Sequence, residues 1–93
     1  MVVGLLTLDL HFPHARSLKD KRKELASLKD RLRHGFNAAV AELAYQDVWQ
    51  RTSLGIVTLN SQQAVVEQIL ASARRDVENH LNGVVINADL RFF

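Results

Sequence analysis

The residues with the clearest capacity for chemistry are the basic side chains between Arg16 and His34. This stretch holds eight lysines and arginines against three acids, a balance of +5, whereas the rest of the chain holds four against seven, a balance of −3. Clustered arginine and lysine create a local positive field and bind phosphates through charge-assisted hydrogen bonds. The pattern predicts a surface for a polyanion such as RNA. The residues expected to meet its phosphates are Arg16, Lys19, Arg22, Lys23, Lys29 and Arg33.

An ordinary solvated helix surface is the alternative interpretation of the same stretch. Asp20, Glu24 and Asp30 are interleaved with the cations, and opposite charges three or four residues apart on a helix offset one another. The charge pattern alone leaves both interpretations open. Only a polyanion-binding surface implies an affinity that falls steeply with salt.

Lys21 differs from the other basic residues because its helical angle places it among leucines. Four leucines of the predicted helix lie within one arc of about 80° at 100° per residue, and Lys21 falls inside that arc. These are Leu18, Leu25, Leu28 and Leu32. Glu42 shares a strand face with Val40, toward the helix layer, so we predict a partly buried Lys21–Glu42 ion pair that ties helix to sheet. A catalytic Lys21 is less favoured, because no other chemical groups converge on it.

Metal and nucleophile chemistry has little support in this sequence. His11 and His14 are three residues apart and close to Asp9, but Pro13 between them leaves their geometry undefined and no fourth ligand is evident. The chain has no cysteine, which excludes disulfides, thiolate metal sites and cysteine nucleophiles. Its four glycines are scattered and form no phosphate-binding loop. We therefore expect no enzyme activity, no cofactor and no metal.

Two aromatic residues, Trp49 and Phe93, are candidates for contact with a partner. Trp49 lies in the connection between the second and third predicted strands. Large aromatics usually bury most of their area, which favours Trp49 folding back on its own strands. In the other interpretation it anchors a second subunit or another protein. Strand alternation points Phe92 and Phe93 to opposite faces, which makes Phe93 a candidate dimer contact.

Hydrophobic periodicity predicts the elements that position these residues. Alternating apolar residues predict strands at 2–12, 36–45, 54–60 and 84–92. One amphipathic helix begins after a Ser17 cap and runs to about His34, with Gly35 just beyond its end. A second helix is expected to be capped by Ser61 and to end at Asn82 and Gly83. One face of the last strand is expected to carry Val84, Ile86, Ala88, Leu90 and Phe92.

The element order β-α-β-β-α-β predicts one ferredoxin-like domain over residues 1–93. Two helices that follow strands, each apolar on one side, must cover one face of a four-stranded antiparallel sheet. RNA recognition by the other, open face would need two or three aromatics there. That face is expected to carry Thr7, Asp9, His11, Asn87, Asp89 and Arg91. RNA is therefore expected on the helix and not on the sheet.

The composition and the start of the chain predict a cytoplasmic protein. Hydrophobic residues make up 47% and charged residues 24%, as in ordinary folded domains. The apolar stretch 1–10 has no basic segment before it and no small-residue cleavage site, and Asp9 interrupts it. No stretch approaches the 18 uncharged apolar residues of a membrane span.

Three groups of residues, in order along the chain, match a known pattern. They are Ser17-Leu18-Lys19-Asp20-Lys21-Arg22, then Phe36-Asn37 with Val40-Ala41-Glu42, and then Asp47-Val48-Trp49-Gln50-Arg51 with Leu54-Gly55-Ile56. Together they resemble the YlxP-like family of small bacterial proteins, whose function is unassigned. Ala38 and Ala39 stand where that family more often has valine and serine. The resemblance implies a ferredoxin-like fold and a gene neighbourhood rich in translation initiation and ribosome maturation factors.

Two functions from different classes follow as hypotheses. The first is a non-enzymatic accessory protein that docks on ribosomal RNA or a ribosomal particle through the basic helix, a direction that the resemblance supports by association. The alternative is a homo-oligomeric protein-interaction module that uses the open sheet face, the edge second strand and Trp49. No small-molecule substrate and no membrane is implied by either.

Overall fold

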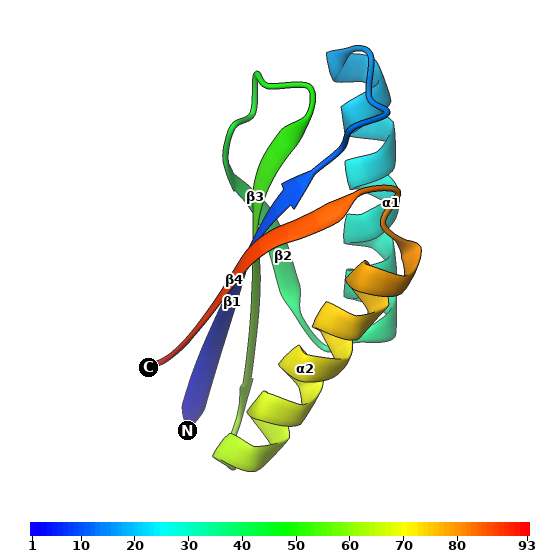
Figure 1. The fold of residues 1–93 in the computed structure, drawn as a ribbon. Helices are drawn as coiled ribbons and strands as arrows, with labels where there is room; N and C mark the ends of the chain where they lie inside the picture. Colours follow the sequence, from blue (N-terminus) through cyan, green and yellow to red (C-terminus); the bar gives the residue numbers. More distant parts are fainter.

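Six elements of secondary structure follow in the order that the sequence predicts. The computed structural model describes residues 1–93. The elements are β1 (Val2–His11), α1 (Leu18–Gly35), β2 (Ala39–Ala44), β3 (Arg51–Asn60), α2 (Gln63–His80) and β4 (Val84–Phe92). The strands form one antiparallel sheet in the order β2-β3-β1-β4. Both helices lie on the same side of this sheet (Figure 1), so the expected ferredoxin-like α+β fold is confirmed.

The hydrophobic core lies between the helices and the two central strands. Every second residue of β1 from Leu6 to Leu10 is buried, and so is Phe12 just after the strand, as period-two alternation requires of a strand with one covered face. Leucines of α1 and the apolar stripe of α2 pack on these strands. Gly4 lets α2 approach β1 closely, because a Cβ there would overlap a methyl carbon of Val66. A side chain at this position would push the helix off the sheet.

Two strands begin later or earlier than their hydrophobic patterns suggest. The second strand was predicted from residue 36 but begins at Ala39, because Phe36 ends α1 by donating its backbone N–H to Leu32 O. The third was predicted from residue 54 but begins at Arg51. Arg51, Thr52 and Ser53 are polar, yet their backbones pair with the buried end of β1. Tertiary pairing therefore extends this strand beyond its apolar run.

Of the predicted helix caps, those at Gly35 and Ser61 are wrong in detail. Gly35 is the last residue of α1 and not the residue beyond it, and no glycine in the chain has a positive φ. Ser61 does not cap α2. The N-cap residue is Gln62, which makes no side-chain capping bond, and its backbone N–H is bound instead by Asn60 Oδ1 at 3.1 Å.

A β-bulge in β4 changes the face that its first residues present. The pairing with β1 shifts between Asp9 and Leu10, so Leu10 pairs with Val85 and not with an even-numbered residue. Val85 packs against the core, whereas Val84 is exposed. The prediction that Val84 shares the inner face with Ala88 is therefore wrong. From Asn87 onward the register is regular and the predicted alternation holds.

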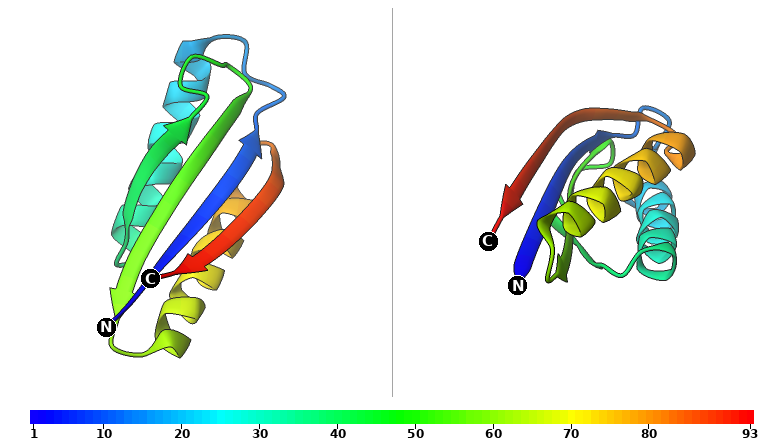
Figure 2. Two further views of the ribbon diagram at one scale, coloured as in Figure 1. Left: turned by 90° about the vertical axis from the view of Figure 1, so that its left-hand side faces the viewer. Right: turned by 90° about the horizontal axis from the view of Figure 1, so that it is seen from below.

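The helix layer covers the sheet unevenly. α2 packs on β1 and β3, and α1 packs on β2 and against α2. β4 pairs with β1 but lies at the margin of this layer, and in Figure 2 its C-terminal end extends away from both helices. The two edge strands, β2 and β4, therefore have different surroundings.

Candidate nucleic-acid interface

The first turn of α1 is fixed by hydrogen bonds that its own sequence supplies. Ser17 Oγ accepts from the backbone N–H of Asp20 at 3.1 Å, and Asp20 Oδ2 accepts from the backbone N–H of Arg16 at 3.0 Å. These reciprocal bonds satisfy backbone donors that a helix start leaves free. The predicted Ser17 cap is confirmed, and the basic helix begins at a defined residue.

Lys21 and Glu42 form the ion pair that the sequence analysis placed between helix and sheet. Lys21 Nζ lies 2.9 Å from Glu42 Oε2, and the two side chains are 1% and 15% exposed. The ammonium also donates to the backbone carbonyl of Tyr45, and Thr52 Oγ1 donates to the same Glu42 oxygen, both at 2.5 Å. A buried ion pair is tolerated when further hydrogen bonds satisfy its charged groups, as they do here.

The conformation of the loop after β2 places the Tyr45 carbonyl within hydrogen-bond distance of Lys21. Tyr45 has φ 65°, a left-handed conformation that is costly for a residue with a large side chain. Its ring is held by the guanidinium of Arg51, which lies 4.5 Å from the ring centroid. Gln50 Nε2 donates to the carbonyls of Pro13 and Ala15, so this loop is also tied to the chain that leads into α1.

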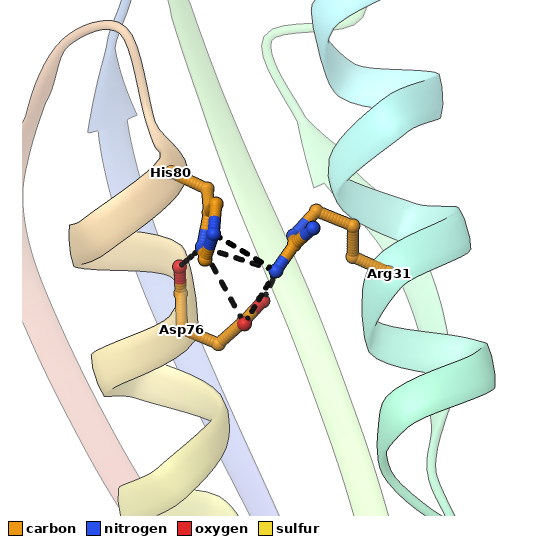
Figure 3. A network of polar contacts seen from close by, with 3 residues as sticks. All are labelled: Arg31, Asp76 and His80. Atoms are coloured by element: carbon orange, nitrogen blue, oxygen red, sulfur yellow. Dashed lines mark hydrogen bonds and ion pairs between the residues drawn. The ribbon is translucent and has the colours of Figure 1, made fainter.

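A second polar network joins α1 to α2 and was not predicted. Arg31 donates to both Asp76 carboxylate oxygens, at 2.8 and 3.3 Å, and its Nη2 lies within 3.1 Å of both ring nitrogens of His80 (Figure 3). His80 is anchored in turn to the backbone carbonyl of Asp76 at 2.9 Å. The only sequence signal was the four-residue spacing of Asp76 and His80, and their partner Arg31 lies 45 residues before Asp76.

The remaining basic residues of the stretch are free of carboxylate partners. Of its eight cations, Lys21 and Arg31 pair with Glu42 and Asp76, and the other six take part in no ion pair of the structure. These six are Arg16, Lys19, Arg22, Lys23, Lys29 and Arg33, the residues predicted to contact phosphates. Two of the three acids interleaved with them accept hydrogen bonds from backbone N–H groups. Asp20 caps α1, and Glu24 Oε1 accepts from the backbone N–H of Asn82 at 2.9 Å.

The six cations without a carboxylate partner lie on two adjoining surfaces of α1, and we call these six residues together the basic face. Arg22, Lys29 and Arg33 line a groove of about 390 Å³ between α1 and the edge strand β2, together with Asp30 and Glu42. Arg33 Nη2 donates to the backbone carbonyl of Val40 at 3.0 Å, which holds its guanidinium over that strand. The others, Lys19 and Lys23 on the outer surface of α1 and Arg16 just before it, are exposed.

The open face of the sheet is polar toward the His11 end of β1 and apolar toward its Val3 end. On β1 and β4 the predicted polar residues share that face, since Thr7 pairs with Asp89 and Asp9 with Asn87. The apolar side chains of this face come from β1, β2 and β3 and were not predicted. They are Val3, Leu5, Ala39, Ala41, Leu43, Val57 and Leu59. Within its strands this face carries no phenylalanine, tyrosine or tryptophan, and His11 is its single aromatic ring, fewer than the two or three that base stacking by a sheet needs.

The two aromatic candidates for partner contact lie at opposite ends of the sheet. Trp49 is in the loop before Arg51, which pairs with His11 at the far end of β1. It is 51% exposed, so the interpretation in which it folds back and buries most of its area is wrong. Phe93 exchanges backbone hydrogen bonds with Val3 at the other end of β1. Within one copy, the two residues therefore do not form one patch.

The structure gathers no group that suggests metal chemistry. No cluster of three or more histidine, cysteine or acidic side chains is suitable for a metal ion. His11 lies within the sheet, whereas His14 lies outside it, in the exposed connection to α1. No helix of the structure is both long enough and apolar enough to cross a membrane.

The fold and the site define a small ferredoxin-like α+β domain with a basic first helix. The model of a family described as a protein of unknown function, DUF503, matches residues 3–90. The chain is also 36% identical to the uncharacterized protein YlxP of Bacillus subtilis (strain 168) over 69 residues, which is 74% of this chain and 75% of that protein. The chain belongs to the DUF503 family, in agreement with the YlxP-like resemblance of its motifs.

A comparison with solved structures adds one distant likeness. The de novo designed protein Ferredog-Diesel is 17% identical to this chain, with a TM-score of 0.46 over 98% of this chain and 83% of the designed one. At this level of similarity the comparison carries no argument about function.

Proposed function

We propose that this protein is a non-enzymatic, cytoplasmic accessory factor that docks on ribosomal RNA or a ribosomal particle through the basic face of α1. The observation that carries the proposal is the separation of roles among the eight basic residues of the stretch. Two of them form ion pairs within the fold, and six have no carboxylate partner. Cations that stabilise a fold are usually paired, whereas unpaired cations on one helix form a field that phosphates can neutralise.

The arrangement of the basic face supports contact with a phosphate backbone. Arg22, Lys29 and Arg33 follow one another along the groove beside β2, and Lys19 and Lys23 lie on the adjoining outer surface. Successive turns of a helix are about 5.4 Å apart, which lets such a row reach more than one phosphate. Within its strands the open sheet face has only His11 as an aromatic ring, so a sequence-independent, helix-centred mode is the one that these residues favour.

The test is cosedimentation of the purified protein with ribosomal subunits at low and moderate salt. The variant Arg22→Glu/Lys23→Glu removes two adjacent cations of the basic face. The matched control is Arg74→Glu/Arg75→Glu, an adjacent pair on the exposed surface of α2 with the same change in net charge. We expect wild type and the α2 variant to migrate with the subunits at low salt, and the α1 variant to be lost.

The salt dependence measures how many phosphates are engaged. If about four are contacted, log K is expected to fall against log salt with a slope of roughly −3 to −4. A flat salt dependence, no binding at low salt, or equal loss in both charge variants would each contradict docking through α1. In those cases the basic face is a solvated helix surface, as in the alternative interpretation of the sequence.

A further inference from the structure

β4 is an exposed edge strand, and beyond the bulge near its start little of its apolar length is protected against pairing. It is nine residues long, it contains no proline or lysine, and its apolar side chains are among the most exposed of the molecule. Leu90 and Phe92 point to the helix side of the sheet, opposite Leu6 and Gly4, yet they remain 42% and 37% exposed because the helix layer does not cover them. A long apolar edge of this kind is a template for another strand.

The backbone groups available on this edge follow from the pairing with β1. Val3 and Phe93 exchange both backbone hydrogen bonds, at 3.1 and 2.7 Å. In an antiparallel ladder such pairs alternate, so Arg91 and Asp89 also bond inward to β1. The N–H and C=O groups of Ala88, Leu90 and Phe92 therefore point outward to the free edge.

The charges on β4 select one way for two copies of this edge to pair. In a symmetric antiparallel pair centred on Leu90, Leu90 faces its own equivalent, and Asp89 faces Arg91 of the second copy. Asp89 and Arg91 lie on the same open face, at an Nε–Oδ2 distance of 3.0 Å within one chain. Centring the pair on Asp89 or on Arg91 would set like charges directly opposite, which destabilises a sheet. The bulge near Ile86 blocks registers shifted further toward the start of the strand.

The same register places a large side chain beside a groove that can receive it. Ala88 would face Phe92 of the second copy, on the helix side of the sheet. Ala88 also lines a groove of about 170 Å³ between α2 and β4, whose other walls are mainly apolar. These walls are formed by Leu6, Leu70, Ala71 and Leu90, with Glu67 and Arg74 at the rim. An apolar cavity of about 150 Å³ is sufficient for a benzene ring, so the groove can accommodate the phenyl ring.

We infer that the chain forms a symmetric dimer in which the β4 strands of two copies pair in antiparallel orientation about Leu90. The sheet becomes continuous across the two copies, and Phe92 of each enters the α2–β4 groove of the other. A two-fold axis perpendicular to the sheet keeps all helices on one side. The basic face of α1 borders β2, at the opposite edge, and stays uncovered, so this dimer neither requires nor prevents docking on RNA.

The decisive experiment is a charge-exchange pair of variants. Asp89→Arg leaves arginine at positions 89 and 91, and Arg91→Asp leaves aspartate at both. Each variant alone is expected to dimerise at least about tenfold more weakly than wild type, because like charges then face one another across the pair. An equimolar mixture is expected to form the heterodimer with near wild-type affinity, as measured by analytical ultracentrifugation and by native mass spectrometry.

The apolar part of the interface is tested by Leu90→Lys, with Leu59→Lys as the matched control. Leu59 is 57% exposed and lies on β3, away from β4. We expect Leu90→Lys to be monomeric and Leu59→Lys to dimerise as wild type, with both variants showing a cooperative thermal transition. A wild-type protein that stays monomeric at all concentrations, a mixture that forms no heterodimer, or a dimer that survives Leu90→Lys would overturn the inference.

Discussion

The two edge strands of the sheet, β2 and β4, differ in how well they are protected against pairing with another strand. β2 is six residues long, α1 packs along it, and two cations of that helix bind it: Lys21 pairs with Glu42, and Arg33 donates to the Val40 carbonyl. β4 is nine residues long, lies at the margin of the helix layer and has exposed apolar side chains. An edge that is short and bound by charged side chains resists further pairing, whereas a long apolar edge favours it.

This contrast separates two surfaces that could otherwise be confused. The β2 side presents charge and is suited to a phosphate-bearing partner. The β4 side presents backbone groups and apolar side chains in a self-complementary order and is suited to a second copy. The homo-oligomer hypothesis from the sequence assigned the contact to the open sheet face, the second strand and Trp49. The dimer that we infer uses the last strand instead, with Leu90 at its centre.

Removing Lys21 should have the largest effect on the β2 side. Lys21→Ala leaves Glu42 with an uncompensated, largely buried charge, and we expect a loss of about 3–5 kcal/mol in the free energy of unfolding. Urea denaturation measures this change. Lys23→Ala, on the exposed surface of the same helix, should stay within about 0.5 kcal/mol of wild type. A loss below about 1 kcal/mol for Lys21→Ala would contradict a role in holding the helix to the edge strand.

The Thr52 hydroxyl should contribute the next largest effect at the same edge. Thr52→Val keeps the shape of the side chain but removes the hydrogen bond to Glu42 Oε2. Because hydrogen bonds to charged groups are stronger than neutral ones, we expect a loss of about 1.5–3 kcal/mol by the same denaturation measurement. In the Glu42→Gln background the cost of Thr52→Val should shrink, since the acceptor is then neutral. Equal costs in both backgrounds would show that the carboxylate is not the relevant partner.

Arg33 connects the fold to the proposed interface, and its removal should be milder. Arg33→Ala loses the bond to the Val40 carbonyl, and we expect about 1 kcal/mol of destabilisation together with weaker binding to ribosomal particles. Arg33→Lys should restore part of the binding, because charge is retained, but less of the backbone contact. The dimer constant should not change, since β4 lies at the other edge. Unchanged cosedimentation in Arg33→Ala would remove this residue from the proposed RNA surface.

The Arg31–Asp76 pair should give the smallest effect because it lies at neither edge. Its side chains are partly exposed, so we expect Arg31→Ala to cost about 0.5–1 kcal/mol. Neither dimerisation nor cosedimentation should respond to this variant. Thermal unfolding, sedimentation velocity and the subunit-binding assay check the three expectations, and a change in dimerisation would mean that the helix layer influences the β4 edge.

Much of the architecture could be read from periodicity, because each helix and strand has a continuous apolar pattern. The register of β1 followed from alternation, and the Lys21–Glu42 pair followed from a helical angle and a strand parity. The bulge that moves Val85 into the core could not be predicted from the sequence, because a single inserted residue does not change the composition of the strand. The start of β3 at Arg51 was missed for a related reason: polar residues joined the strand through pairing with β1.

The amino-acid order alone specifies the ferredoxin-like fold, the position of the basic helix and the burial of Lys21, because these depend on local periods and on the few ways to cover a sheet. It does not specify which cations remain unpaired, because Arg31 meets Asp76 and His80 only after two distant helices pack together. Nor does it specify that β4 lies beyond the helix layer. That outcome depends on where the two helices pack on the four strands, and this packing is set by tertiary contacts along the whole chain.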